Sequence, residues 1–459
     1  MFIEKIKTEG LAHLSYLIGA DGQAAVIDPR RDCEVYVERA AARGSQITHI
    51  FETHRNEDLI SGAPRLSQMT GAPVCHGPAP EAPVAYARTV REGEHFSLGS
   101  LRITVLETPG HTDDSLSFAV YDADFGQEAV AVFTGDALFV GDVGRTDFYP
   151  RRAEEVAGLL YDSLGKILAL GDQAILYPAH GAGSVCGNNM AAREFSTLGY
   201  ERLNNPMLRV ENREDFVARK LAEHHYQPPY FALMERLNSD GAATPPASLP
   251  PPPLDIAESK RLMPSARLVD VRGIAAFLGA HLPGSFALPD SMISGFAGWF
   301  LRPDEDLLLV ADDAAQAGAA ARQLARIGFD RVVGYVKPAL PVWAAGGEAF
   351  SALPVVGVAE VARRVADRPN GWALLDVRGR SEVETGIVAG AQTIYLGELP
   401  DHLDRLDRRR HYTVMCASGV RSTVAASLLR RAGFDQVDVF LGSMAAWRRA
   451  GQDIVQPRL

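Results

Sequence analysis

The chain lacks three features that would place it in a common class of proteins. Its four cysteines are widely spaced and form no paired framework of the kind found in disulfide-rich secreted domains. Lysine and arginine form no dense block, and 46 basic against 57 acidic residues give a formal net charge of −11. The sequence has neither a signal-peptide core at its N-terminus nor an apolar run of transmembrane length. These absences predict a cytoplasmic protein that binds neither nucleic acid nor a membrane, and small anionic substrates remain open.

At 459 residues the chain is too long for one ordinary core, and a proline-rich segment supplies its clearest boundary. Residues 239–254 include four consecutive prolines and predict an extended, semi-rigid linker after a first region of residues 1–238. In this first region strand-like and helix-like patterns alternate, which indicates a layered α/β architecture. The strand-like runs are residues 15–18, 24–29, 47–53, 101–106 and 129–134, with a helical pattern at 34–43.

An incomplete metal-binding signature overlaps the third of these strands. The segment 53–59, Thr-His-Arg-Asn-Glu-Asp-Leu, resembles the His-x-His-x-Asp-His signature of the metallo-β-lactamase fold. Asn56 and Leu59 stand in place of its second and third histidines, but His111 and Asp136 fall where further ligands of that fold belong. The two ligand clusters that a binuclear zinc site needs are therefore not expected.

The residues that remain suit a different metal centre. His54, His111 and Asp136 each follow a strand, so the loops that carry them can converge from distant parts of the sequence. Two imidazoles and one carboxylate suit a mononuclear iron(II) with open coordination positions for oxygen and substrate. We expect one iron(II) per chain, with zinc or no metal at all as the alternatives.

Three later segments extend the resemblance to the persulfide dioxygenases, which share this fold. These segments are residues 139–147, 177–184 and 197–202. The resemblance covers about residues 1–238 and implies an αββα sandwich in which His54, His111 and Asp136 bind iron(II). It also implies that a low-molecular-weight persulfide is oxidised to sulfite and a free thiol.

The same resemblance implies roles for four further residues. Asp58 and His180 are expected to support the metal ligands through hydrogen bonds. Arg145 is expected to contact the anionic part of a thiol carrier. Cys186 is a candidate sulfur relay between sites, and a buried structural cysteine is the alternative.

The second region contains an internal repeat. Leu-Val-Asp-Val-Arg-Gly at 268–273 returns as Leu-Leu-Asp-Val-Arg-Gly at 374–379, an offset of 106 residues. Two further pairs of segments repeat at nearly the same offset, namely 327–332 with 432–437 and 343–347 with 447–451. The repeat predicts two similar α/β domains, at residues 255–353 and 354–459.

The last domain resembles a rhodanese, a sulfurtransferase fold. A buried strand runs into a short loop and a helix expected to begin near Ser422, so Cys416 faces backbone N–H groups and the positive helix end. Both features lower the pKa of a thiol and stabilise an anion, which makes Cys416 the predicted sulfur-accepting nucleophile. Arg421 closes the loop as a charge-assisted contact for a thiosulfate-like donor, and Ser418 and Gly419 are further predicted substrate contacts.

The middle domain has lost this chemistry. Ala311 takes the place of Cys416 and Gln316 that of Arg421, and two aspartates after Ala311 would repel an anion. We expect a catalytically silent copy with a structural role.

Together these motifs predict a sulfur-handling fusion enzyme, in which iron-dependent persulfide oxidation is joined to sulfane-sulfur transfer through Cys416. Its expected small-molecule partners are a thiol persulfide, thiosulfate or sulfite, and homo-oligomerisation is left open. The alternatives are a sulfurtransferase whose first domain binds no metal, a zinc thioesterase of the glyoxalase II type, and a non-enzymatic scaffold.

Overall fold

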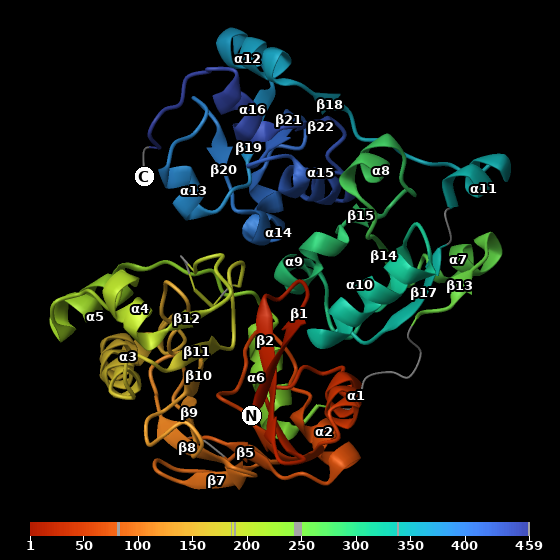
Figure 1. Cartoon of the computed structure of the whole chain (residues 1–459). Helices are drawn as coiled ribbons and strands as arrows, with labels where there is room; N and C mark the ends of the chain where they lie inside the picture. The colour runs from red at the N-terminus through yellow and green to blue at the C-terminus, as the bar shows by residue number, and fades with distance from the viewer. Residues whose placement is uncertain (80–82, 185, 188–189, 243–249, 337–338, 458–459) are drawn as a thin grey trace. The chain divides into compact units, whose positions relative to one another are not determined.

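The computed structural model describes residues 1–79, 83–184, 186–187, 190–242, 250–336 and 339–457. These residues form two compact units, one with two six-stranded sheets and the other with two five-stranded sheets (Figure 1). Residues 243–249, at the centre of the predicted linker, lie outside the described residues. The finer domain boundaries remain predictions.

The first unit contains two mixed sheets that follow one another along the chain. The first sheet has the strand order β1-β2-β3-β4-β5-β6 and the second the order β12-β11-β10-β9-β8-β7. The strands of the first sheet are β1 (Phe2–Thr8), β2 (His13–Ala20), β3 (Gln23–Ile27), β4 (Gln46–Phe51), β5 (Val74–His76) and β6 (Arg88–Thr89). Those of the second are β7 (His95–Leu98), β8 (Leu101–Glu107), β9 (Leu116–Asp122), β10 (Ala131–Gly135), β11 (Ile175–Pro178) and β12 (Ser196–Thr197). All five predicted strands and the predicted helix are present.

Helices cover the outer faces of the two sheets (Figure 1). They are α1 (Glu34–Ala42), α2 (Ala63–Thr70), α3 (Ala153–Leu168), α4 (Leu198–Asn204) and α5 (Arg213–Ala222), and a short 3₁₀ turn at Pro150–Arg152 precedes α3. Helix α6 (Phe231–Asp240) instead lies beside the loop after β4, where Asn238 Nδ2 donates to the carbonyl oxygens of Asn56 and Leu59. Helix α6 reaches Asp240 and so enters the segment predicted as linker.

Buried side chains explain why these elements stack as four layers. Alternate residues of a strand face opposite sides of its sheet. On β2, Tyr16 packs with Phe118 and Phe133 between the two sheets, and Leu17 packs with the helical residues Tyr36 and Leu66 on the outer side. A third apolar cluster joins α3 to the outer face of the second sheet. The predicted αββα sandwich is confirmed.

The second unit contains two copies of one parallel five-stranded sheet. The strand orders are β13-β17-β16-β14-β15 and β18-β22-β21-β19-β20, which match position by position. The first copy contains β13 (Pro253–Leu254), α7 (Ile256–Leu262), β14 (Ala266–Asp270), α8 (Ile274–Gly279), β15 (Phe286–Ala287), α9 (Ile293–Phe300), β16 (Asp306–Val310), α10 (Ala314–Arg326), β17 (Val332–Val336) and α11 (Ala339–Ala345). The second contains β18 (Val355–Val356), α12 (Val358–Asp367), β19 (Trp372–Asp376), α13 (Arg380–Glu384), β20 (Gln392–Thr393), α14 (Leu399–His402), β21 (His411–Met415), α15 (Val420–Arg431), β22 (Val437–Phe440) and α16 (Ser443–Arg449). The sequence repeat thus corresponds to a repeated fold.

The two copies share part of their apolar core. Phe277 and Ala287 of the first copy belong to the same buried cluster as Val424 and Leu429 on α15 of the second. The backbone N–H of Ala287 also donates to Ser427 Oγ on α15, at 3.0 Å. The first copy therefore helps to hold the helix that follows the Cys416 loop, which agrees with the structural role expected for it.

Within the described residues, no helix combines the length and the apolar character that crossing a membrane requires.

Candidate functional sites

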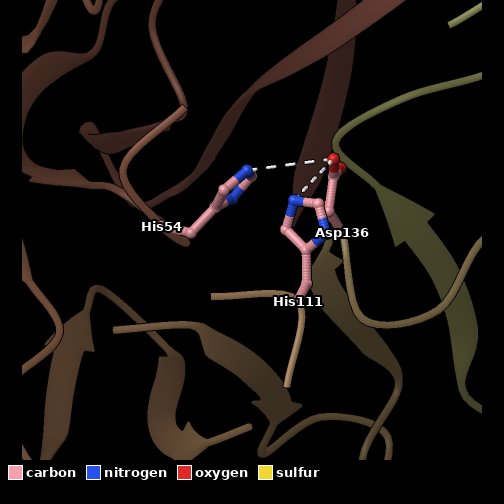
Figure 2. Close-up of side chains that lie close together, drawn as sticks. All are labelled: His54, His111 and Asp136. Carbon is pink, nitrogen blue, oxygen red and sulfur yellow. Dashed lines mark ion pairs between the residues drawn. The ribbon is translucent and has the colours of Figure 1, made fainter. Parts of the chain in front are cut away.

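Three loops of the first unit bring His54, His111 and Asp136 together. His54 follows β4, His111 lies between β8 and β9, and Asp136 directly follows β10. All three side chains are buried, and one ligand atom from each lies within 4.8 Å of the others. Asp136 Oδ2 is 3.8 Å from His54 Nε2 and 3.5 Å from His111 Nε2 (Figure 2). The structure therefore assembles the three residues that the sequence singled out.

Hydrogen bonds fix the orientation of both imidazoles. His111 Nδ1 lies 2.9 Å from the carbonyl oxygen of Arg145, which can only accept, so Nδ1 carries a proton. Thr53 Oγ1 donates to Asp28 Oδ2 and therefore accepts from His54 Nδ1 at 2.9 Å. With both Nδ1 atoms hydrogen-bonded outward, both Nε2 atoms face the centre, as metal ligation requires.

Burial and charge act differently on the three groups. Burial lowers the pKa of His54, which keeps this imidazole neutral. Burial opposes protonation of His111 too, but the carboxylates of Glu57 and Asp136 raise its pKa to about 9. Burial is also outweighed at Asp136, whose pKa is held well below its usual range by His180 and the other two histidines. The site therefore has a strong excess of electron-pair donors around one buried point, which fits a divalent cation.

Gly144 is packed against two of these residues. A Cβ atom at this position would lie 2.0 Å from the carbonyl oxygen of Asp136 and 3.2 Å from His111 Nδ1. Gly144→Ala is therefore expected to displace both loops, at a cost of about 1–3 kcal/mol of stability for the overpacked site. Thermal unfolding measures the loss of stability, and metal content measures whether the displaced loops still hold His111 and Asp136 in place for a metal. A variant with wild-type values for both would mean that the loops yield without disturbing the ligands.

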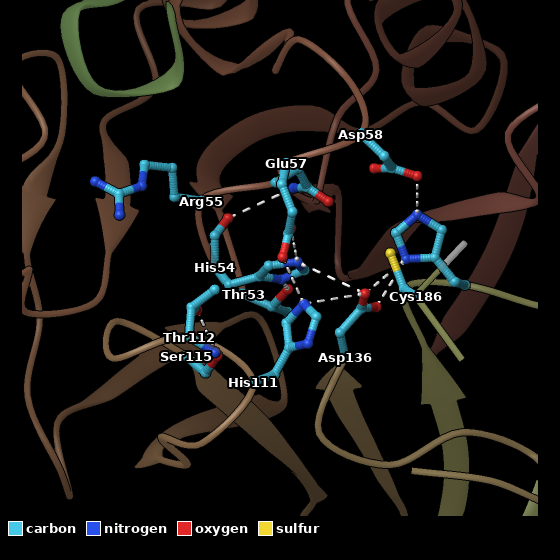
Figure 3. Close-up of polar contacts among 12 residues, drawn as sticks. Thr53, His54, Arg55, Glu57, Asp58, His111, Thr112, Ser115, Asp136 and Cys186 are labelled. Atoms are coloured by element: carbon cyan, nitrogen blue, oxygen red, sulfur yellow. Dashed lines mark hydrogen bonds and ion pairs between the residues drawn. The ribbon is translucent and has the colours of Figure 1, made fainter. Parts of the chain in front are cut away.

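Glu57 is a fourth ionisable group at this centre, and the sequence analysis did not predict it as a ligand. Glu57 Oε1 lies 2.9 Å from His111 Nε2, and Oε2 lies 3.7 Å from His54 Nε2 (Figure 3). The side chain is buried. The available signal was its position between Asn56 and Asp58 in the incomplete signature.

A second group of possible ligands lies on the other side of Asp136. Asp58, His180 and Cys186 are buried, with one ligand atom from each within 4.8 Å of the others. His180 Nε2 is 3.1 Å from Asp58 Oδ2, and Nδ1 is 2.7 Å from Asp136 Oδ1. The expectation that two ligand clusters are not available is therefore wrong. Cys186, predicted as a sulfur relay, supplies the thiol of this group (Figure 3).

The roles expected for these residues are compatible with their positions but stay predictions. His180 contacts the Asp136 carboxylate, and Asp58 contacts His180, as supporting residues would. Burial raises the pKa of the Cys186 thiol well above its usual value, which opposes a free thiolate at this position. Metal binding would reverse this effect, because a coordinated thiol loses its proton.

Arg145 lies in a closed environment. Its side chain is 1% exposed, and its Nε and Nη2 atoms donate to the two carboxylate oxygens of Asp147, each at 2.6 Å. Nη1 donates to the carbonyl oxygen of Tyr226 at 3.2 Å, and the guanidinium lies over the Phe148 ring. Its charge is thus matched inside the protein, and the predicted contact with a thiol carrier remains a prediction.

In the second unit, Cys416 lies at the start of α15. The thiol is 1% exposed, and the backbone N–H of Gly419 donates to Sγ at 3.1 Å. The hydroxyls of Ser422 and Ser443 lie 3.7 and 3.9 Å from Sγ. Helix α15 begins at Val420, two residues before the expected start, so the positive helix end is close to the sulfur.

The remaining residues of this loop have different environments. Ser418 is exposed, and Arg421 is paired with Glu382 through two contacts of 2.6 Å. A cavity of about 330 Å³ lies beside the loop and is lined by residues that include Glu382, Ala417 and Arg448. The predicted anion-binding charge of Arg421 is thus matched by a carboxylate that the sequence analysis missed.

Glu382→Gln is expected to improve the use of anionic sulfur donors. Removal of the carboxylate charge frees Arg421, and a gain of about 1.4 kcal/mol in donor binding would lower KM for thiosulfate about tenfold. Steady-state kinetics at varied thiosulfate concentration measure this change. An increased KM would instead show that Glu382 holds Arg421 in the orientation that the donor needs.

The corresponding loop of the first copy is closed by its own side chains. The backbone N–H of Asp312 donates to Gln316 Oε1, and the N–H of Gln316 donates to Asp313 Oδ1, both at 2.8 Å. Gln316 Nε2 also donates to the carbonyl oxygen of Val271 at 3.3 Å, so the residue in the place of Arg421 is bound within the first copy.

Family models match both parts of the chain. Residues 8–180 match the metallo-beta-lactamase superfamily and residues 358–450 the rhodanese-like domain. The fold is similar to the crystal structure of a metallo-beta-lactamase from Staphylococcus aureus subsp. aureus COL, with a TM-score of 0.66 and 30% sequence identity. The match covers 74% of this chain and 98% of that one.

Two curated relatives each match less than half of the chain. A probable metallo-hydrolase of Burkholderia pseudomallei (strain 1710b) is 29% identical over 259 residues, which are 48% of this chain and 86% of the relative. A hydroxyacylglutathione hydrolase of Methylobacterium sp. (strain 4-46) is 33% identical over 192 residues, which are 36% of this chain and 71% of the relative.

Proposed function

Because the chain belongs to the metallo-beta-lactamase superfamily and also contains a rhodanese-like domain, we propose that it is a two-site enzyme of sulfur metabolism. The first unit oxidises a low-molecular-weight persulfide to sulfite, and the last domain transfers sulfane sulfur through Cys416. The observation that carries the first half is the buried group of His54, His111 and Asp136, with both imidazoles oriented for ligation.

The ligand set fits a mononuclear iron(II) centre. His54 Nε2 has no hydrogen-bond partner among the described residues although it is fully buried, as expected of an atom reserved for a metal. Iron(II) held by these three residues would supply the activation of dioxygen needed to oxidise the terminal sulfur of a persulfide. Thr53 and Arg145 would hold the ligand imidazoles in place through the hydrogen bonds to their Nδ1 atoms.

The second site performs a displacement at sulfur. The Cys416 thiolate attacks the sulfane sulfur of thiosulfate, and the bond from Sγ to that sulfur forms as the bond to the sulfite group breaks. The bonding electrons leave with sulfite, and the protein keeps a persulfide on Cys416. The N–H of Gly419 lies at 3.1 Å from Sγ and stabilises negative charge on sulfur before and after transfer. Sulfite is thus common to both proposed reactions.

Metal analysis followed by oxygen uptake tests the first half. Protein purified without chelator should contain about one iron per chain and should consume oxygen with glutathione persulfide. Absence of oxygen consumption by iron-loaded protein with any low-molecular-weight persulfide would contradict the dioxygenase. Absence of any metal would instead favour a sulfurtransferase with a metal-free first unit.

The second group of ligands favours one other candidate function. Asp58, His180 and Cys186 lie next to Asp136, so a second metal could share that carboxylate, as in a binuclear hydrolase acting on a thiol ester. The similarity to a hydroxyacylglutathione hydrolase supports the same reaction class. Two metal ions per chain, one of them lost in Cys186→Ser, together with hydrolysis of a glutathione thiol ester, would favour this function over the oxidation.

A further inference from the structure

The loop that carries the incomplete signature places the Glu57 carboxylate at the centre, whereas the histidine expected at position 56 is missing. The Asn56 side chain donates through Nδ2 to the backbone oxygen of His54 at 3.5 Å. The next residue, Glu57, points inward and is 7% exposed (Figure 3). The signature leaves this position unspecified, so the inward carboxylate is a property of this chain.

Glu57 faces the same two atoms as Asp136 does. Its carboxylate oxygens lie 2.9 Å from His111 Nε2 and 3.7 Å from His54 Nε2. Asp136 Oδ2 lies 3.5 and 3.8 Å from these atoms. Each imidazole nitrogen is therefore within 4 Å of both carboxylates, and four side chains converge on one buried point.

This convergence requires a positive charge between the four groups. Because both Nδ1 atoms donate outward, both Nε2 atoms face the two carboxylates, and only a proton or a metal ion between them makes these contacts attractive. Lone pairs and buried anions repel one another unless a cation or a proton lies between them. Glu57 Oε2 is buried without a hydrogen-bond partner among the described residues, and Oε1 has His111 Nε2 at 2.9 Å. A divalent cation would satisfy all four groups and would be neutralised by the two carboxylates.

We propose that Glu57 is a fourth metal ligand, which replaces the histidine lost at Asn56 and gives a centre with two histidines and two carboxylates. This role depends on the metal centre proposed above but not on the reaction that it catalyses. One open coordination position is then occupied by a carboxylate on a short loop, and an anionic substrate must either bind beside it or displace it.

Metal affinity tests this role directly. Fe(II) under anaerobic conditions and Co(II) are titrated into full-length protein in competition with a chromophoric chelator. Loss of an outer hydrogen-bond partner of a ligand typically weakens metal binding 10–100-fold, and we expect Glu57→Gln to weaken it by at least about tenfold. The Co(II) absorption spectrum should also change in intensity, because the number of ligands changes.

Matched variants separate ligation from a general disturbance of the loop. Asn56→Ala removes the neighbouring side chain and should leave the affinity within about twofold of wild type. The double variant Asn56→His/Glu57→Ala restores the histidine of the signature and should recover part of the lost affinity. Thermal unfolding and circular dichroism report in each variant that the first unit is folded, because sulfur transfer through Cys416 reports on the second unit.

The outcomes distinguish this role from the function proposed above. Wild-type affinity and an unchanged Co(II) spectrum in Glu57→Gln, with persulfide oxidation intact, would overturn the ligand role of Glu57 alone. Tighter metal binding in Glu57→Gln would also overturn the ligand role. It would show that the Glu57 carboxylate pairs with His111 in the metal-free protein and competes with the metal. Absence of metal binding in the wild-type protein would overturn both the ligand role and the metal centre.

Discussion

Cys416→Ser is expected to abolish thiosulfate sulfurtransferase activity, with a loss of roughly 10³-fold or more, because serine cannot carry sulfane sulfur. The reason is local. The nucleophile is the atom that Gly419 N–H and the start of α15 face, and a hydroxyl oxygen there is both a weaker nucleophile and unable to form a persulfide. The measurement is the rate of sulfite release from thiosulfate in the presence of a thiol or cyanide acceptor.

Two controls make the Cys416→Ser result specific. Cys75→Ser removes a different buried thiol, on β5 of the first unit, and should retain transfer. Metal content and oxygen uptake should be unchanged in Cys416→Ser. Sulfur transfer that survives in Cys416→Ser would show that another group accepts the sulfur, and the rhodanese half of the proposal would be wrong.

His111→Ala is expected to have the reciprocal effect. It removes one of two imidazole ligands and leaves the Asp136 and Glu57 carboxylates facing a single histidine, so metal binding should weaken by more than the roughly 10–100-fold that loss of an outer partner costs. Iron content after purification should fall from about one per chain to nearly none, and oxygen uptake with a persulfide should disappear with it. Elemental analysis and an oxygen electrode measure the two effects.

The control for this variant is another histidine. His95→Ala replaces an exposed residue on β7 and should keep both the metal and the oxygen uptake. Sulfur transfer through Cys416 should be normal in both variants. Retention of iron in His111→Ala would mean that the metal binds elsewhere, and the second group of Asp58, His180 and Cys186 would be the first place to look.

Much of the fold was readable from the sequence, because local patterns fix local structure. Strand-like runs of residues predicted five of the strands of the first unit, and the offset of 106 residues predicted two similar α/β domains. The positions of His54, His111 and Asp136 just after strands predicted that they could meet, since strands of one sandwich end at a common edge.

The sequence by itself also determined which of the two repeated domains carries a nucleophile. The sequence placed Cys416 directly before a helix and showed that the first copy has Ala311 at the equivalent position. Both features follow from residue identity and spacing alone. The start of α15 was missed by two residues, because helix ends depend on capping interactions that a pattern does not resolve.

Only the tertiary structure decided which partners these residues have. Arg421 was expected to be free for an anion, yet Glu382 lies 39 positions away in the sequence and occupies its guanidinium. Cys186 joins Asp58 and His180 in a group that the sequence analysis had excluded. Glu57 turns inward at a position where the signature specifies nothing. In each case the decisive quantity is the direction of a side chain after distant loops have packed, and sequence spacing carries no information about that direction.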